Sequence, residues 1–140
     1  MHVAVTGAGI VSAIGIGKQE VLESLLSQKT GIGQMQYLQS EHTELPVGEV
    51  KCSNAEMKQQ LGIPSSQVVS RTVLMGALAV RQALAEANLS VGSRRIALIA
   101  GTTVGGMDVT ERYFLQLKDD DSLLYLLDKH DCGSSTVEIA

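Results

Sequence analysis

The expected fold follows from residues 96–107, which read IALIAGTTVGGM. The first five of them form a continuous apolar run that ends at Gly101. Such a run is typical of a strand buried on both faces of its sheet, and we expect this strand at about 95–101. The second half is rich in glycine and threonine, which is typical of a turn that a ligand or another backbone can approach. Because ligands gather at the carboxyl ends of strands in open α/β sheets, we expect this turn at a ligand-binding edge.

The composition describes a chain with enough apolar material for a core and no bias toward nucleic acid. The 140 residues are 44% apolar with a mean hydropathy of +0.14, and this length is typical of one domain. The net charge is −4, from 11 basic and 15 acidic residues, and aromatic residues are only 3% of the chain. Nucleic-acid binding relies on positive charge and on rings that stack with bases, so we expect no nucleic-acid partner.

The chain carries no signal that would direct it to a membrane. Its N-terminus lacks a basic region followed by a cleavable apolar segment, and no apolar run approaches the roughly 18 residues of a membrane span. The two cysteines, Cys52 and Cys132, are far apart and resemble no disulfide framework, which favours a reducing compartment. We therefore expect a cytoplasmic protein without a membrane span.

Further elements are expected from apolar periodicity and from turn signals. Two more strands are predicted at about 2–6 and 45–50, the second at a sheet edge because Pro46 cannot donate to a central ladder. Helices are predicted at 18–27, 53–61, 68–87, 107–118 and 122–129, and a last one is predicted to begin at Ser135. Gly31 and Gly33 are expected to end the first helix.

Helix-capping signals support these boundaries. Ser53 with Glu56, and Ser135 with Glu138, each fit the pattern of a capping box. Asn88 suits the left-handed conformation that ends the longest helix.

The longest predicted helix bears on the completeness of the fold. Its middle, from Val73 to Val80, is apolar all round, which is typical of a helix buried between two layers. The expected fold class is therefore α/β, with a mixed sheet and a buried central helix. Three strands cover such a helix on one side only, so residues 1–140 are expected to form one incomplete region whose partner layers are missing.

Gly7 and Gly9 follow the first predicted strand and invite comparison with dinucleotide-binding turns. That motif needs a Gly or Ala where Ser12 stands, and it needs a helix that begins at the glycines. Gly15 and Gly17 instead keep the chain irregular. Close packing of backbones explains the glycines better, and a nucleotide-binding domain is the weaker alternative.

No complete catalytic or metal site is visible in the residue pattern. Cys132 follows His130 and Asp131, but neighbours at this spacing rarely present their side chains to one point, so a small buried cysteine and a surface histidine are favoured. Cys52 precedes a helix without a histidine near it in sequence and is expected to be inert. The histidines are scattered and the acidic run 119–121 is expected at the surface, so no metal or cofactor is predicted.

Five short motifs occur in order along the chain. They are VAVTGAGIVSAIG at 3–15, LLSQKTGIG at 25–33, SRT at 70–72, AEANL at 85–89 and GTTVGGM at 101–107. Together they resemble the N-terminal portion of the β-ketoacyl-acyl-carrier-protein synthases, condensing enzymes of the thiolase fold. The second and last motifs are similar to the family's LLxGKSGI and GSGIGGL segments.

The resemblance implies the N-terminal part of a thiolase-like layered fold and a role in fatty acid, polyketide or polyene synthesis. In this family of 3-oxoacyl-acyl-carrier-protein synthases, a cysteine at a helix N-terminus takes an acyl group as a thioester. Two histidines assist decarboxylation of malonyl-carrier protein, and the resulting carbanion attacks the thioester. The nucleophile motif, similar to TACSSA, would fall after Ala140. No catalytic residue is therefore assigned in this chain, which is expected to be inactive alone.

The resemblance also implies an acyl pocket and partners. The family's glycine turn lines the acyl pocket near the dimer interface, so the expected substrate residues are Thr103, Val104, Gly105 and Gly106, with Val104 touching the growing chain. The implied partners are acyl carrier protein and a second subunit, in a homodimer or a heterodimer. A non-catalytic partner similar to chain-length factors is the alternative, which a residue other than cysteine at the nucleophile position would favour.

Overall fold

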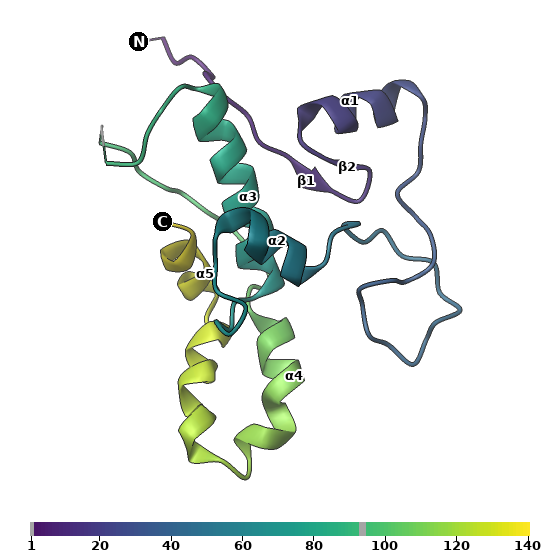
Figure 1. Cartoon of the computed structure of the whole chain (residues 1–140), viewed down its shortest axis with the longest axis vertical. Coiled ribbons are helices and arrows are strands. Elements are labelled where there is room, and N and C mark those ends of the chain that lie inside the picture. The colour runs from purple at the N-terminus through teal and green to yellow at the C-terminus, as the bar shows by residue number, and fades with distance from the viewer. Residues whose placement is uncertain (1, 93–94) are drawn as a thin grey trace.

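The protein is a small α/β chain in which helices predominate (Figure 1). The computed structural model describes residues 2–92 and 95–140. In these residues the elements are, in order, β1 (Val11–Ser12), β2 (Gly15–Ile16), α1 (Lys18–Leu26), α2 (Asn54–Leu61), α3 (Arg71–Glu86), α4 (Met107–Leu117), η1 (Asp121–His130) and α5 (Cys132–Ile139). Element η1 is a 3₁₀-helix, and β1 and β2 form an antiparallel hairpin. The α/β class is thereby confirmed, whereas this hairpin stands where a larger mixed sheet was expected.

Helix α3 is the centre of the fold. It contacts β1, α2 and α5, and its buried residues are Val73, Leu74 and Leu78. Ser70 caps its first turn, because the Ser70 Oγ accepts a hydrogen bond from the Val73 amide at 3.2 Å. The helix predicted at 68–87 is thus confirmed with a slightly later start. The buried cluster around it comprises Cys52, Met57, Val69, Val73, Leu74 and Leu78.

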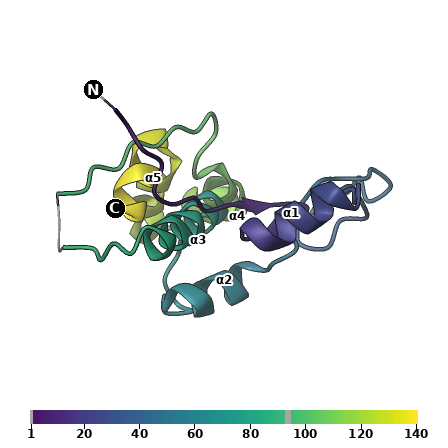
Figure 2. The same cartoon turned by 90° about the horizontal axis from the view of Figure 1, so that it is seen from above.

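The segment before β1 packs along α3 through two glycines (Figure 2). Gly7 and Gly9 lie so close to the carbonyl groups of Ala83 and Ala79 that a Cβ on either glycine would overlap the carbonyl oxygen. The expectation that these glycines serve close backbone packing is confirmed. No helix begins at them, since α1 starts only after Gly17.

The strand predicted at 2–6 is wrong, because no described residue pairs with this segment and the side chains of Val3 and Val5 are exposed. The Ala8 amide donates to Glu86 Oε2 at 2.7 Å, and the Ile10 amide donates to Gln82 Oε1 at 2.9 Å. Side chains of α3 therefore hold the residues that follow the predicted strand, and these hydrogen bonds lie outside 2–6.

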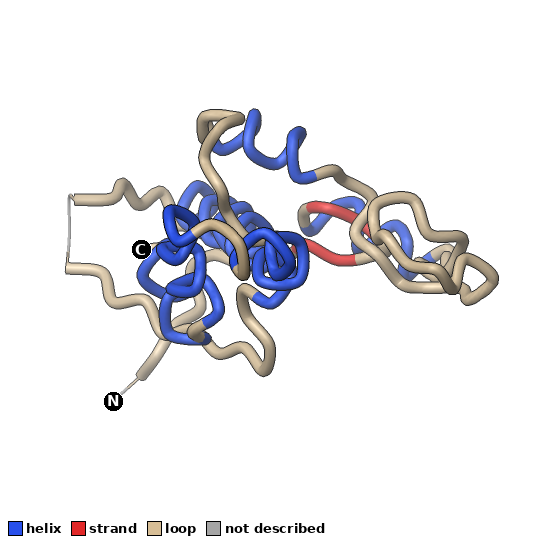
Figure 3. Tube along the Cα trace, turned by 90° about the horizontal axis from the view of Figure 1, so that it is seen from below, coloured by secondary structure: helices blue, strands red, loops and turns tan. Residues whose placement is uncertain are grey.

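The strand predicted at 95–101 is also wrong. The segment is drawn as loop in Figure 3, and no described residue forms a ladder with it. Ile99 is 95% exposed and Ile96 is 47% exposed. A buried strand needs hydrogen-bonding neighbours and apolar cover on both faces, and the described part of the chain supplies neither to this segment.

The extended segments elsewhere are short. In the hairpin, Val11 pairs with Ile16 across the turn. The edge strand predicted at 45–50 is reduced to a single bridge, in which Gly33 and Val47 exchange two backbone hydrogen bonds of 3.0 and 2.8 Å. Pro46 lies next to the bridge and has no backbone N–H to donate, so it cannot extend the bridge into a longer ladder.

The helix ends confirm some capping predictions and correct others. The Ser53 and Glu56 capping box is present, and Asn88 takes a left-handed φ of 52° after α3. Helix α1, however, ends before the predicted glycines, because Gln28 adopts the left-handed conformation with φ 56°. Asp120, in the acidic run, caps η1, because its Oδ1 accepts a hydrogen bond from the Ser122 amide at 2.9 Å. The helix predicted to follow this run therefore begins there.

The second predicted capping box is wrong. Helix α5 already begins at Cys132, and its cap is Asp131, whose Oδ1 accepts from the Gly133 amide at 2.8 Å. Ser135 consequently lies inside the helix, where its side chain is buried.

Candidate functional site

The predicted acyl-binding turn lies at the N-terminus of α4. Gly106 precedes the helix with a left-handed φ of 81°, and its Cα lies against the backbone of Lys129. Gly105 is buried beside it, whereas Thr103 and Val104 are exposed, Val104 by 52%. The structure thus packs the two glycines of the turn against η1 and α5 and leaves the other two predicted residues at the surface.

Ser135 of α5 meets this turn from the opposite side. A Cβ placed on Gly105 would stand 2.7 Å from the Ser135 Oγ. The side chain is 4% exposed, and its hydroxyl has no hydrogen-bond partner among the described residues. Only a glycine at position 105 therefore fits between α5 and the turn.

An apolar cleft of about 270 Å³ lies next to the turn, between α4 and the end of η1. We call it the helix cleft, and it is lined by Met107, Thr110, Glu111, Phe114 and His130. The Thr110 Oγ1 and the His130 Nδ1 share a hydrogen bond of 3.1 Å across it. None of the predicted residues 103–106 lines this cleft, whose first lining residue is Met107, directly after the turn.

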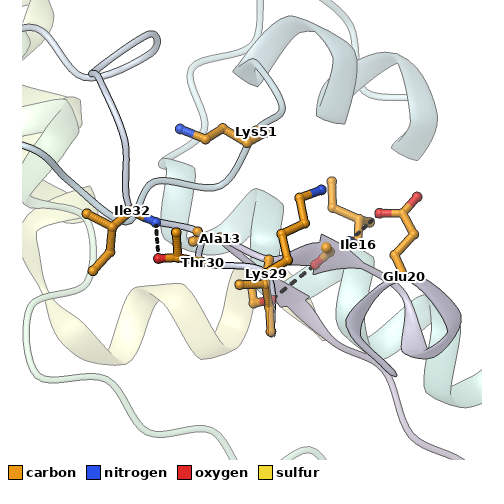
Figure 4. Close-up of a pocket in the computed structure, with 11 residues that line it drawn as sticks. Ala13, Ile16, Glu20, Lys29, Thr30, Ile32 and Lys51 are labelled. Carbon is orange, nitrogen blue, oxygen red and sulfur yellow. Dashed lines mark hydrogen bonds between the residues drawn. The ribbon is translucent and has the colours of Figure 1, made fainter. Parts of the chain in front are cut away.

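A second cleft, which the sequence did not indicate, lies beside the hairpin (Figure 4). We call it the hairpin cleft, and its volume is about 220 Å³. Its lining residues are Ser12, Ala13, Ile14, Gly15, Ile16, Glu20, Lys29, Thr30, Gly31, Ile32 and Lys51. Nothing in the sequence indicates that residues 29 and 51 come to one place, because they are separated by a long polar segment.

A buried carboxylate supports the wall that carries Lys51. The Glu49 side chain is only 3% exposed and accepts backbone hydrogen bonds from Gln36, Tyr37 and Leu38, the last two at 3.0 Å. Lys51 Nζ lies 3.6 Å from the same carboxylate. Burial by itself raises the pKa of Glu49, but the three amide hydrogen bonds and the Lys51 charge outweigh burial and hold the pKa below its usual value.

The loop that Glu49 binds is also joined to α3. The Tyr37 ring lies under the guanidinium of Arg71, with 5.7 Å between the Arg71 Cζ and the ring centroid. Arg71 also donates to the Asn54 Oδ1 and the Val50 carbonyl, both at 2.8 Å. The first residue of α3 therefore fixes both the loop and α2 in place.

Cys52 is a free cysteine in the described structure. Cys52 is buried, and burial together with the Glu56 carboxylate raises the pKa of its thiol, although the Arg71 charge acts in the opposite direction. A thiol with a raised pKa is a poor nucleophile. The side chain of Cys132 lies outside what the structure describes.

No group of three or more His, Cys, Asp or Glu side chains in the described part of the chain is arranged to hold a metal ion. No helix within 2–92 or 95–140 has the length and apolar character needed to cross a membrane.

No family model, curated protein or solved structure matches the chain.

Proposed function

We propose that this chain is part of a 3-oxoacyl-acyl-carrier-protein synthase and that the helix cleft with its turn holds the acyl chain. The order of the five motifs supports the assignment. The structural observation that supports the assignment most directly is an apolar cleft of about 270 Å³. Its lining begins at Met107, the residue that follows the predicted turn at 103–106.

The reaction that this proposal entails is a decarboxylative Claisen condensation. Malonyl-carrier protein loses carbon dioxide, and the resulting carbanion attacks the carbonyl of an enzyme-bound acyl thioester, releasing the cysteine thiolate and forming a 3-oxoacyl product. The proposed contribution of residues 1–140 is to shape the acyl-chain site, since no residue of this chain matches the family's nucleophile. In this proposal the chain acts in the cytoplasm, with acyl carrier protein and a second subunit as partners.

Acyl-chain binding is the direct test. Titration with octanoyl-pantetheine should shift the amide NMR signals of residues 103–110 and of His130. Phe114→Ala removes a cleft wall and should weaken binding. Leu115→Ala is the matched control, because Leu115 is 74% exposed on the same helix and does not line the cleft. Shifts confined to other regions, or equal effects of the two variants, would refute the acyl-site assignment.

A separate assay tests whether residues 1–140 lack the catalytic nucleophile. Residues 1–140, mixed with acyl-carrier and malonyl-carrier proteins, should form no 3-oxoacyl product, whereas a longer chain with the nucleophile cysteine should form it. Turnover by residues 1–140 would show that the nucleophile lies within them. A longer chain with another residue in place of that cysteine would instead identify the non-catalytic partner.

A further inference from the structure

We propose that the hairpin cleft binds a phosphate monoester that carries a small apolar organic group. This site is separate from the helix cleft, because its lining comes from residues 12–51, whereas the lining of the helix cleft comes from residues 107–130. The proposal does not depend on the acyl-chain assignment.

Two ammonium groups make the cleft attractive to an anion. Figure 4 shows Lys29 on the hairpin side and Lys51 on the opposite side. The backbone of Lys29 is fixed at the end of α1, where its amide donates to the Ser24 carbonyl at 2.8 Å. Among the described residues, the Lys29 ammonium has no ion-pair partner, so its charge is available to a ligand.

Lys51 keeps much of its positive potential although Glu49 lies 3.6 Å away. The Glu49 carboxylate already accepts three backbone amide hydrogen bonds, and those donors share in stabilising its negative charge. The Lys51 side chain is 40% exposed and lines the cleft, whereas that of Glu49 is 3% exposed and does not. A ligand in the cleft therefore meets the ammonium first.

A hydroxyl completes the donor set. The Thr30 Oγ1 accepts a hydrogen bond from the Ile32 amide at 3.1 Å, which leaves its O–H free to donate. Two ammonium groups and one hydroxyl suit a dianion better than a monoanion. A phosphate monoester carries a charge of about −1.5 to −2 at neutral pH, and lysine binds phosphate as a point charge.

The other end of the cleft fixes the orientation of the ligand. Glu20 lies there, and its Oε2 accepts from the Ile16 amide at 2.9 Å. This carboxylate repels an anion, so the phosphate belongs at the end next to Thr30. The wall contributed by Ile16, which lies beside Glu20 in Figure 4, then faces the organic group of the ester.

Close packing holds the walls of the cleft together. A Cβ on Gly31 would stand 2.7 Å from the Cβ of Ala13, and a Cβ on Gly15 would stand 2.7 Å from the Cβ of Glu20. The segments that carry Thr30 and Glu20 therefore lie against the hairpin without space to move inward. A preformed cleft of this kind loses little entropy when a ligand binds.

The test is an NMR titration with inorganic phosphate and with n-propyl phosphate at constant ionic strength. We expect saturable shifts of the amides of residues 13–16 and 30–32, and tighter binding of the propyl ester. Lys29→Gln and Lys51→Gln should each weaken binding about tenfold, which is the loss of one charge-assisted hydrogen bond. Lys118→Gln is the matched control, because Lys118 is exposed after α4, and it should bind like the parent.

A fourth variant tests the orientation. Glu20→Gln keeps the acceptor for the Ile16 amide and removes the repelling charge, so it should tighten phosphate binding. An adventitious, non-saturable response, equal affinities of the lysine variants and the Lys118→Gln control, or weaker binding by Glu20→Gln would each overturn the proposal. Amide spectra of the unliganded variants would show whether each remains folded.

Discussion

The Ser135 hydroxyl lies against Gly105, so that a side chain at position 105 would begin only 2.7 Å from the Ser135 Oγ. This contact joins the turn before α4 to the interior of α5. It explains why the glycine is buried at a place where a surface loop was expected to receive a ligand.

Gly105→Ala should destabilise the protein. Its Cβ would meet both the Ser135 Oγ and, at 2.8 Å, the Thr102 Cγ2, and overpacking of this kind costs about 1–3 kcal/mol. Urea unfolding followed by circular dichroism measures the change in the free energy of unfolding. Gly101→Ala is the control, because a Cβ at Gly101 has open space around it. Equal stabilities of the two variants would show that the turn does not dock on α5.

Ser135→Ala should stabilise the protein. The buried Ser135 hydroxyl has no partner among the described residues, and leaving such a group unsatisfied costs about 1–3 kcal/mol. The neighbouring Ser134 is a matched contrast, because its Oγ donates to the Asp131 carbonyl at 2.7 Å, so Ser134→Ala should lower stability. Thermal unfolding of the two variants should therefore shift in opposite directions. A lower unfolding temperature for Ser135→Ala would mean that its hydroxyl is satisfied in solution.

Glu49 should make stability depend on acid pH. Its pKa is lowered in the folded state, so its contribution is fully present above the unfolded-state pKa of about 4.3 and is lost as pH falls through the lower folded-state pKa. Glu49→Gln should reduce stability at neutral pH and flatten the fall in stability below pH 4.3. Unfolding curves at a series of acid pH values measure this. Glu41→Gln, in the exposed loop, should leave stability at neutral pH unchanged.

The exposed side chains of Ile96 and Ile99 should make the protein self-associate. Unpaired extended backbone with apolar side chains such as Ile99 favours edge-to-edge pairing. Ile99→Lys should lower the weight-average mass in analytical ultracentrifugation. Val137→Lys is the control, because Val137 is 77% exposed but lies on a helix and cannot extend a ladder. A stable monomer of the unmodified chain at high concentration would contradict this prediction.

The helices could be predicted from the sequence because their signals are local. The capping box of Ser53 and Glu56 and the left-handed Asn88 act over a few residues, and both are confirmed. Ser135 shows the limit of such signals, since it fits a capping box while Asp131 caps the helix one turn earlier.

The strands could not be predicted because pairing depends on distant segments. The run at 96–100 has the composition of a buried strand, yet no described residue pairs with it. The hairpin cleft escaped prediction for the same reason. Lys29 and Lys51 come together only because Gly33 pairs with Val47 and because Glu49 binds the intervening loop. The predicted turn at 103–106 precedes the helix cleft in sequence but does not line it, and only its glycines are buried.

The packing of Gly7 and Gly9 on α3 has a consequence for the order in which the chain folds during synthesis. The Ala8 amide bonds with Glu86, which is 78 positions later in the sequence. The segment around Ala8 therefore has no docking surface until α3 has also emerged from the ribosome. Contacts of such long sequence separation form slowly, because a large loop must close before they form. We expect the Ser53 to Glu86 region, whose two helices are close in sequence, to fold first and then to capture the N-terminal segment.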